Sequence, residues 1–441
     1  MTTGRRRVIV LSEYESRIVE DARLTARDRE LTEDPALNRL ITLRSLDRDR
    51  LEIRAGWYVG VLELDAMDIR VVPKLVGGNL NVLRMLEYTT ATTAVHHLDV
   101  RRTFDTGDPH LRDLICDLLN RTTAALLHHG PRQDYLTRTE SLPVLRGRLL
   151  PTRQLLRRHG RLDRLECRYD ERSTDIPDNQ LCAEALSLAA RTAADASIRA
   201  RSRRLATDFA ALCTPSRYPH GHDHGYGRHN EHYRPAHQWA RLLLAGAGIH
   251  GLFTTGPADS RVFLLDMNTL FEDFVTRLVS RTLAPHQVTV RAQSVHPGIV
   301  VHEATGATHT ELRPDLLLTR GHGPTARRHP VDVKYKLYDR RKLSSDDVYQ
   351  AFVYAHTLAG THADASPTAS CTLLYPTEAP ADPRSVVVRT AAGTRSARIT
   401  AYPLDVPALL DDLATGDEPS ARRELASALL QPLAVEVADS H

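Results

Sequence analysis

The alternation of hydrophobic and polar positions changes twice along the chain. Short β-branched runs dominate the first hundred residues, beginning with residues 7–11. Two further runs, at 57–64 and 69–73, flank the polar segment Asp65 to Asp68, which predicts a hairpin with a four-residue loop. The first part of the chain is therefore predicted to be rich in strands.

Helical spacing follows in the middle of the chain. From about Asn79 leucines recur three and four residues apart, and the spacing returns at 111–119. An alanine- and leucine-rich segment predicts a long helix from 175 to about 200. Residues 132–172 are dense in arginine, which indicates either a solvated helix face or a surface that contacts phosphate or a partner.

Six of the 22 histidines fall within 18 residues, in the segment 219–237. Their spacing among glycines does not fix tetrahedral zinc geometry, and it does not match H-E-x-x-H. We therefore interpret this segment as a low-complexity loop that binds metal only adventitiously.

The chain behaves as a separate α/β unit from about residue 250 to its end, and this unit holds the candidate chemistry. Large apolar side chains at helical spacing predict a buried amphipathic helix at 269–283. Glu272 lies in its first turn and has two interpretations. It caps the helix with Thr269 in a capping box, or it supplies a carboxylate to a site.

Two predicted strands carry charged residues. Alternation places Asp315 on one face of a strand at 313–319, and Asp332, Lys334 and Lys336 together on one face of the next, at 331–336. Such charges are costly to bury on a central strand, and a divalent cation held by both aspartates would compensate them. An edge pair with solvated side chains explains the same spacing.

Glu272 and the backbone carbonyl of residue 333 would complete an oxygen ligand set suited to Mg²⁺, with Mn²⁺ as an alternative. Lys334 then points into the same pocket, where its amine would lower the pKa of an attacking water or balance charge on a pentavalent phosphorus. We predict Glu272, Asp315 and Asp332 as metal ligands, and these three with Lys334 as the catalytic residues.

A helix capped by Ser344 or Ser345 is predicted next. Gln350 and Tyr354 lie one turn apart on it and face the predicted lysine strand, although a polar surface explains them equally. We predict that Gln350, Tyr354 and Lys336 position the substrate.

Composition narrows the class of protein. The 441 residues, 41% hydrophobic and 26% charged, are typical of a globular protein with two or three domains. No apolar run approaches the roughly 18 residues of a membrane helix, and the first one is too short for a signal peptide. With five scattered cysteines, this predicts a cytoplasmic protein without membrane association. The net charge of +3 does not by itself demand nucleic acid.

Lysine is rare, with four lysines among 58 basic residues and three of them at 334–342. An amine shifts its pKa where a guanidinium does not, so this cluster indicates chemistry, or else chance. No lysine follows glycine and precedes serine or threonine, which excludes a Walker A loop in this chain. Any nucleotide energy must come from another polypeptide.

In combination these segments resemble the PD-(D/E)xK nuclease superfamily and, within it, the McrC family, the nuclease subunits of McrBC-type modification-dependent restriction systems. In the back half the resemblance is carried by Met267–Val275, Arg313–Asp315, Val331–Lys336, and Asp347–Gln350 with Tyr354. In the front half it is carried by Gly56–Gly60, Val72–Lys74, Leu145–Gly147, Cys167–Glu171, Asp175–Asn179 and Asn230–Tyr233. It spans most of the chain, although Val333 stands where a smaller residue is more usual.

The resemblance implies a Mg²⁺-dependent DNA endonuclease subunit of an anti-phage restriction system that acts on modified DNA. It implies that the front half docks on a McrB-like AAA+ GTPase ring and stimulates its hydrolysis, while the back half cuts DNA. The residues that contact the GTPase stay unassigned. Two alternatives remain open: a RecB-like repair nuclease that acts on DNA ends without a GTPase, and a non-cutting activator of an AAA+ ring.

The expected fold is multidomain α/β. It comprises a β-rich N-terminal domain at 1–105 that docks the partner and a mostly helical region at 106–250 with the arginine-rich segment and the histidine-rich loop. A restriction-endonuclease-like α/β domain with a mixed central sheet follows at 251–441.

Overall fold

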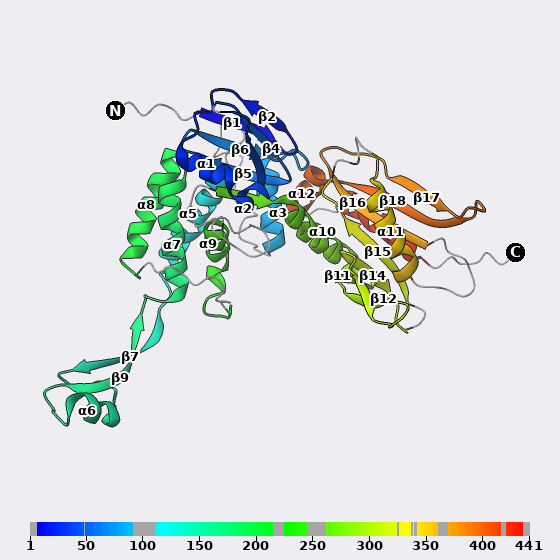
Figure 1. Ribbon diagram of the computed structural model, residues 1–441. Helices are drawn as coiled ribbons and strands as arrows, with labels where there is room; N and C mark the ends of the chain where they lie inside the picture. Colours follow the sequence, from blue (N-terminus) through cyan, green and yellow to red (C-terminus); the bar gives the residue numbers. More distant parts are fainter. Residues whose placement is uncertain are drawn as a thin grey trace. The chain divides into compact units, whose positions relative to one another are not determined.

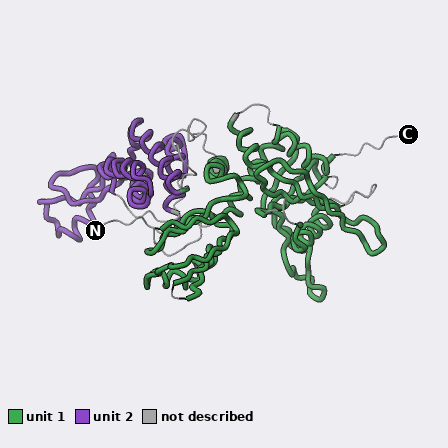
Figure 2. Tube along the Cα trace, turned by 90° about the horizontal axis from the view of Figure 1, so that it is seen from above, with its two compact units in different colours: residues 1–111, 251–254, 264–441 green, residues 112–250, 255–263 purple. Residues whose placement is uncertain are grey.

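A computed structural model describes residues 7–47, 49–90, 111–214, 225–245, 262–323, 326–336, 338, 342–359, 369–415 and 420–434. They form two compact units, coloured separately in Figure 2. The first combines 1–111, 251–254 and 264–441, and the second comprises 112–250 and 255–263. The protein is thus a mixed α/β protein of more than one unit, and the three-domain division by sequence stays a prediction.

The N-terminal part of the first unit consists of two small sheets with two short helices. One sheet has the order β1-β6-β5-β10, from β1 (Arg7–Ser12), β6 (Met67–Val72), β5 (Tyr58–Glu63) and β10 (Val262–Asp266). The other has the order β2-β4-β3, from β2 (Ser16–Val19), β4 (Leu51–Ala55) and β3 (Ile41–Ser45). The helices are α1 (Ala26–Glu33) and α2 (Pro35–Asn38). The predicted strand-rich beginning is confirmed.

The predicted hairpin of β5 and β6 forms, but its loop is shorter than expected. The Leu64 N–H donates to the Met67 carbonyl at 2.8 Å, so two residues turn the chain instead of four. The buried Asp28 carboxylate explains the tight turn, because it accepts the N–H groups of Asp65 and Ala66 at 2.7 and 3.1 Å. That carboxylate comes from α1, which the local pattern does not reveal.

A six-stranded mixed sheet forms the largest layer of the first unit, in the order β11-β14-β15-β16-β18-β17. Its strands are β11 (Val288–Ala292), β14 (Leu316–Arg320), β15 (Arg327–Val333), β16 (Ala369–Thr377), β18 (Arg395–Asp405) and β17 (Arg384–Arg389). β15, β16 and β18 run parallel, and the other neighbours pair antiparallel. A separate ribbon pairs β12 (His296–Val301) with β13 (Thr308–Leu312).

Helices pack around this sheet (Figure 1). The helix α11 (Ser345–Leu358) covers β15, β16 and β18, and a core of Leu317, Leu373, Ile399 and neighbours lies beneath it. The helix α10 (Met267–Leu283) packs against α3 (Asn79–Thr90), β11 and α13 (Ser420–Leu430), while α12 (Val406–Thr415) contacts α3, α13 and β18. Short 3-10 turns are η3 (Ala284–His286) and η5 (Gln431–Leu433).

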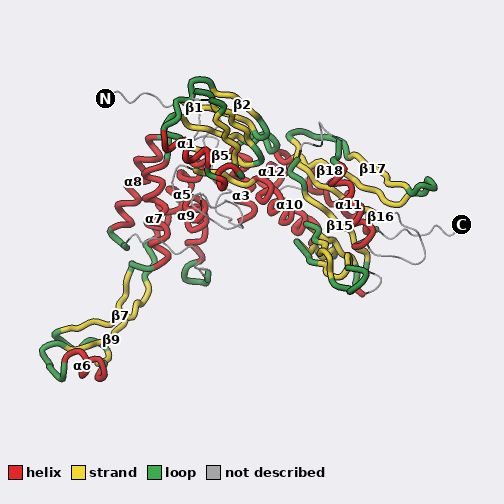
Figure 3. Tube along the Cα trace, viewed as in Figure 1, coloured by secondary structure: helices red, strands yellow, loops and turns green. Residues whose placement is uncertain are grey.

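The second unit is a group of helices from which a β-arm projects (Figures 1 and 3). The helices are α5 (Leu111–His129), α7 (Pro177–Thr192), α8 (Ala196–Ala210) and α9 (Arg234–Ala245), preceded by η2 (Glu231–Tyr233). The arm contains β7 (Asp134–Leu142), β8 (Arg148–Leu149), α6 (Pro151–Arg158) and β9 (Leu165–Ser173). The arginine-dense segment is therefore mainly strand, and only α6 offers the expected helix face.

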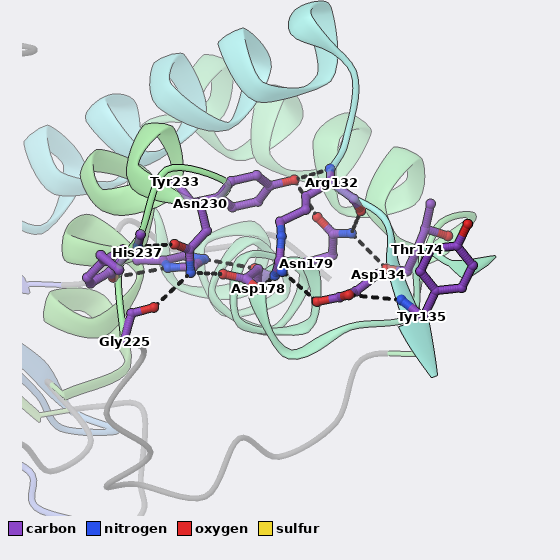
Figure 4. A network of polar contacts seen from close by, with 12 residues as sticks. Arg132, Asp134, Tyr135, Thr174, Asp178, Asn179, Gly225, Asn230, Tyr233 and His237 are labelled. Atoms are coloured by element: carbon purple, nitrogen blue, oxygen red, sulfur yellow. Dashed lines mark hydrogen bonds and ion pairs between the residues drawn. The ribbon is translucent and has the colours of Figure 1, made fainter. Parts of the chain in front are cut away.

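Polar contacts fix the base of the arm (Figure 4). The Arg132 guanidinium pairs with Asp178 at 2.6 Å, and Asn230 donates to the other oxygen of that carboxylate at 3.3 Å. The Tyr233 hydroxyl donates to Asn179 at 2.7 Å and accepts the Arg132 N–H at 2.7 Å. Two segments singled out in the sequence, at 175–179 and 230–233, thus meet in a buried structural network.

In the described part of the chain, no helix combines the length and apolar character needed to cross a membrane.

Candidate functional site

Polar side chains from three neighbouring strands meet at one end of the six-stranded sheet. β14 and β15 pair with Leu316 opposite Val331, so one further residue in the same register places Asp315 opposite Asp332. β11 and β14 pair with Ala292 opposite Leu316, which places Gln293 opposite Asp315 in turn. The Gln293 N–H donates to the Asp315 carbonyl at 2.9 Å and confirms that register. Opposite residues in antiparallel strands share a face, so the three side chains form a row.

The two aspartates form an acidic pair. Asp332 is 1% exposed, and its Oδ2 receives no hydrogen bond of regular geometry. Burial, and then the charge of Asp315, raise the pKa of Asp332. Burial also raises the pKa of Asp315, against a 2.7 Å hydrogen bond from the Val333 N–H that stabilises its charged form. Two facing carboxylates with raised pKa values fit a bound cation.

Lys334 joins this pair, as alternation predicts. Its Nζ lies 2.7 Å from Asp332 Oδ2, and it donates to Gln350 Oε1 at 3.0 Å. Burial alone would lower the pKa of Lys334, but the Asp332, Asp315 and Asp347 carboxylates raise it. The ammonium is therefore a charged group at neutral pH and does not serve as a base there.

The helix α11 holds this ammonium through two further residues. Gln350 Nε2 donates to the Tyr354 hydroxyl at 3.0 Å, and that hydroxyl donates to the Arg313 carbonyl at 3.0 Å. Ser344 caps α11 by accepting the Asp347 N–H. The expected cap and the expected approach of Gln350 and Tyr354 to the lysine both occur. The chain of contacts anchors Lys334 to the backbone that leads into Asp315.

Glu272 approaches the pair through a residue that the sequence analysis missed. Gln293 Nε2 donates to Glu272 Oε1, and it lies 3.3 Å from Asp315 Oδ1. Burial raises the pKa of Glu272, and the charges of Asp273 and Asp332 add to this effect. Gln293 has a backbone φ of 49°, a left-handed conformation that costs a non-glycine residue free energy. In the sequence, the position of Gln293 just after a β-branched run was the one feature that could have placed it at the end of a strand.

The capping interpretation of Glu272 is wrong. The N-cap of α10 is Asp266, whose carboxylate accepts the N–H groups of Asn268 and Thr269 at 2.9 and 3.2 Å. The helix therefore starts at Met267, earlier than predicted, and Glu272 lies beyond the capping positions. Its side chain is free of helix capping and reaches the row of strand residues.

The donor set decides how well a metal ion fits. Among the described residues, no group of three His, Cys, Asp or Glu side chains is placed to share one ion. Asp315 and Asp332 face one another, whereas the Gln293 amide separates Glu272 from Asp315. Two carboxylates thus fit a hard cation that keeps some of its waters, and Glu272 stands next to them.

Lys336 does not join this group. The strand β15 ends at Val333, and Lys336 Nζ pairs instead with both oxygens of Asp347 at 2.9 and 2.8 Å. The Nζ atoms of Lys334 and Lys336 both reach α11, at Gln350 and at Asp347, so the predicted common face and the predicted role of Lys336 in positioning the substrate stay predictions. Tyr338 and Ser344 also donate to Asp347, so the carboxylate organises the turn after the strand.

Tyr335, between the two lysines, is held by the N-terminal part of the unit. Its hydroxyl donates to Glu13 Oε1 at 2.8 Å, and its carbonyl accepts the Tyr14 hydroxyl at 3.2 Å. Its ring contacts Phe271 of α10 with centroids 5.6 Å apart. These contacts fix the backbone next to Lys334 from the opposite face of the sheet.

The histidine-rich segment is described only in part. His220, His222 and His224 lie outside the described residues, so the interpretation of that loop stays a prediction. His237 is fully buried, with Nε2 at 2.9 Å from the Asp178 carbonyl and Nδ1 at 3.1 Å from the Tyr226 hydroxyl. This histidine is part of the structural network at the base of the arm.

Comparisons with known proteins agree with this architecture. A family model described as McrBC 5-methylcytosine restriction system component matches residues 53–376. A refined half-complex from a tetradecameric assembly of Thermococcus gammatolerans McrB AAA+ hexamers with bound McrC is similar with a TM-score of 0.64 and 19% identity, over 96% of this chain and 99% of that chain. This likeness shows a shared fold.

A cryo-EM structure of the Thermococcus gammatolerans McrBC complex aligns with a TM-score of 0.45 and 20% identity, over 63% of this chain and 88% of that chain. A search of the curated proteins finds no match to this sequence.

Proposed function

The chain belongs to the family of McrBC 5-methylcytosine restriction system components, and on that premise we propose that it is the nuclease subunit of such a system. In this proposal it is a Mg²⁺-dependent endodeoxyribonuclease of the PD-(D/E)xK superfamily that cuts modified DNA in anti-phage defence in the cytoplasm. The observation that carries the proposal is the meeting of the half-buried Asp315 and the buried Asp332 carboxylates with the Lys334 ammonium at one end of the sheet.

In the proposed mechanism Asp315 and Asp332 hold Mg²⁺ or Mn²⁺, with Glu272 alongside. The bound ion would supply Lewis-acid polarisation of a phosphate oxygen. Lys334 acts as a fixed cation, because neighbouring carboxylates raise its pKa. It stabilises the negative charge that grows on the phosphoryl oxygens as the attacking oxygen adds. Gln350 keeps the ammonium in place through its 3.0 Å hydrogen bond.

We also propose a McrB-like AAA+ GTPase ring as the partner. The sequence has no Walker A lysine of its own, so nucleotide hydrolysis must come from a second polypeptide. The similar structure from Thermococcus gammatolerans contains McrB AAA+ hexamers with bound McrC and shares its fold with 96% of this chain. In this division of labour the ring hydrolyses GTP and this chain cuts DNA.

The test is an Asp332→Asn substitution, assayed for cleavage of a methylated plasmid with the partner, GTP and Mg²⁺. We expect cleavage to fall on the order of a thousandfold, because one of two metal-binding carboxylates is lost. Stimulation of the partner's GTP hydrolysis should persist. The matched control is Asp346→Asn, which removes an exposed carboxylate in the first turn of α11.

The other outcomes are equally informative. Undiminished cleavage by Asp332→Asn would show that the site is elsewhere. If the wild-type protein stimulated GTP hydrolysis but never cut DNA, it would be a non-cutting activator. Degradation of linear DNA with Mg²⁺ alone, without a partner, would identify a RecB-like repair nuclease.

A further inference from the structure

A basic cleft opens in the first unit at the far end of α10 from the acidic pair. It encloses about 790 Å³ and is lined by the end of α10, η3, the end of β14, α13 and η5. Four arginines and one histidine line it: Arg281, Arg320, Arg422, Arg423 and His286. None of the described lining residues is acidic. The cleft thus concentrates positive charge in a concave surface, which attracts anions more strongly than a convex one.

Among the described residues, three of the four arginines that line the cleft have no acidic partner. In the described part of the chain, Arg281, Arg320 and Arg422 form no ion pair, whereas arginines elsewhere do, such as Arg84 with Asp411 at 2.9 Å. Two polar atoms of the lining, Thr282 Oγ1 and Arg422 Nε, are buried without a hydrogen-bond partner. Buried polar atoms are usually paired, so these two indicate a ligand with acceptor oxygens.

One of the guanidiniums is already held in place. The Arg281 side chain lies over the Tyr88 ring, with its central carbon 4.9 Å from the ring centroid. This contact restricts the side chain without neutralising its charge. A ligand that binds Arg281 therefore meets an arginine with few rotamers left to lose.

Two elements lead from the acidic pair to the cleft. On α10, nine residues separate Glu272 from Arg281, about 14 Å at 1.5 Å per residue. On β14, five residues separate Asp315 from Arg320, about 17 Å at 3.3 Å per residue. Both elements run toward the cleft from the site, so the cleft lies about 15 Å from it. This length corresponds to about four or five base pairs of duplex DNA.

We propose that this cleft binds backbone phosphates of the DNA on one side of the cut. The proposal rests on the proposed nuclease function, and it adds a contact site that the nuclease chemistry does not require. Guanidiniums bind phosphate oxygens in pairs of parallel hydrogen bonds. A free nucleotide offers the same phosphates, but none of the described lining residues is Phe, Tyr or Trp, on which a base would stack. The repeated phosphates of DNA suit four arginines better.

The test measures binding of a 30-base-pair duplex by the full chain without divalent metal, so that nothing is cut. The variant carries Arg320→Gln and Arg422→Gln, which remove two unpaired charges. We expect its affinity to fall about tenfold near 100 mM salt, and the slope of log K against log salt to weaken by about 1.8, or 0.9 per lost phosphate contact. The loss should be the same for every DNA sequence, because phosphates carry no sequence information.

The matched control carries Arg395→Gln and Arg398→Gln, two exposed arginines of β18 that lie outside the cleft. It loses the same net charge, so an equal fall in affinity and slope would overturn the proposal. Unchanged DNA binding by the cleft variant, with tripolyphosphate or GTP binding lost instead, would also overturn it in favour of a nucleotide site. Thermal unfolding of both variants confirms that they fold.

The result is separable from the proposed nuclease function. If the cleft variant binds DNA normally while Asp332→Asn abolishes cutting, the cleft proposal fails and the nuclease stands. If wild-type protein never cuts DNA but the cleft variant loses DNA affinity, the nuclease proposal fails and the binding site stands.

Discussion

Glu13 offers a quantitative test of how the first sheet supports the segment next to Lys334. Its side chain is 1% exposed. It accepts the N–H groups of Lys74 and Leu75 at 2.7 and 3.3 Å and the Tyr335 hydroxyl at 2.8 Å. Glutamine keeps this shape and, like a protonated carboxyl group, is uncharged and has a carbonyl oxygen that accepts and a second terminal atom that donates. The Glu13→Gln protein therefore mimics protonated Glu13 at every pH.

Burial raises the pKa of Glu13 from 4.5 to about 7, although hydrogen bonds from Lys74, Tyr335 and Leu75 lower it. A folded-state pKa above the unfolded value gives stability that is complete below about pH 4.5 and is lost as the pH rises through about 7. Between pH 5 and pH 8 the wild-type protein should lose about 2 to 3 kcal/mol of its unfolding free energy through Glu13, at about 1.4 kcal/mol per pH unit. Glutamine does not titrate, so the Glu13→Gln protein loses no unfolding free energy at this position as the pH rises.

The assay follows urea unfolding by tryptophan fluorescence in a Trp239→Phe background. Trp57 is then the single tryptophan, and it lies in the same unit as Glu13. We expect the unfolding free energy of Glu13→Gln, relative to that of the parent protein, to rise by about 2 to 3 kcal/mol from pH 5 to pH 8. Other titrating groups are common to both proteins and cancel in the comparison. The exposed Glu20→Gln is the control for loss of one carboxylate.

An advantage that is equal at both pH values would refute the reasoning, because it would mean that the three hydrogen bonds fully offset burial of the charge. An advantage that shrinks at pH 8 would mean that the charged carboxylate is the favoured form.

Two further substitutions test the site and the arm. Gln293→Ala removes the amide that donates to Glu272 and approaches Asp315. Thermal unfolding without metal should therefore show an unfolding free energy lower by about 1 to 2 kcal/mol. Mg²⁺ should restore part of this stability, and an equal loss with and without Mg²⁺ would contradict the proposed site. Gly147→Ala places a Cβ 2.5 Å from a backbone oxygen of β9 at a φ of +68°, so limited proteolysis should cut the arm faster. Gly160→Ala is the control, because it has a φ of +79° and open space; equal cleavage of both would mean that the close approach is unimportant.

Local sequence patterns predicted a structural feature correctly where that feature depends on a single helix or strand. Apolar spacing located α10 and α11 because a helix buries one stripe of its own side chains. Alternation brought Asp332 and Lys334 to one face because they belong to a single strand and its continuation. The pairing of Asp315 with Asp332 followed from two strands that carry acids at matching ends, although only the register of β14 and β15 places them opposite one another.

The parts that sequence reasoning missed depend on contacts between distant segments. Gln293 enters the row through the register of β11 and β14, which its own short run does not encode. Lys336 lies beyond the end of the strand at Val333 and pairs with Asp347 of α11, eleven residues further along the chain. Asp266 competes with Thr269 as the cap of α10, and both residue types suit the position. Each error concerns a choice between locally equivalent partners.

The first unit also shows why the sequence order of the chain is a poor guide to its folding units. β10 pairs with β5 of the first sheet and leads directly into α10, whose first turns carry Glu272. Glu13 and Tyr14 then bind Tyr335, more than three hundred residues later and next to Lys334. A fragment that starts near residue 251 would lose the partner strand of β10 and both tyrosine contacts, while keeping every predicted catalytic residue. The positions of Glu272 and Lys334 therefore depend on the N-terminal sheet, and tests of the site need the full chain.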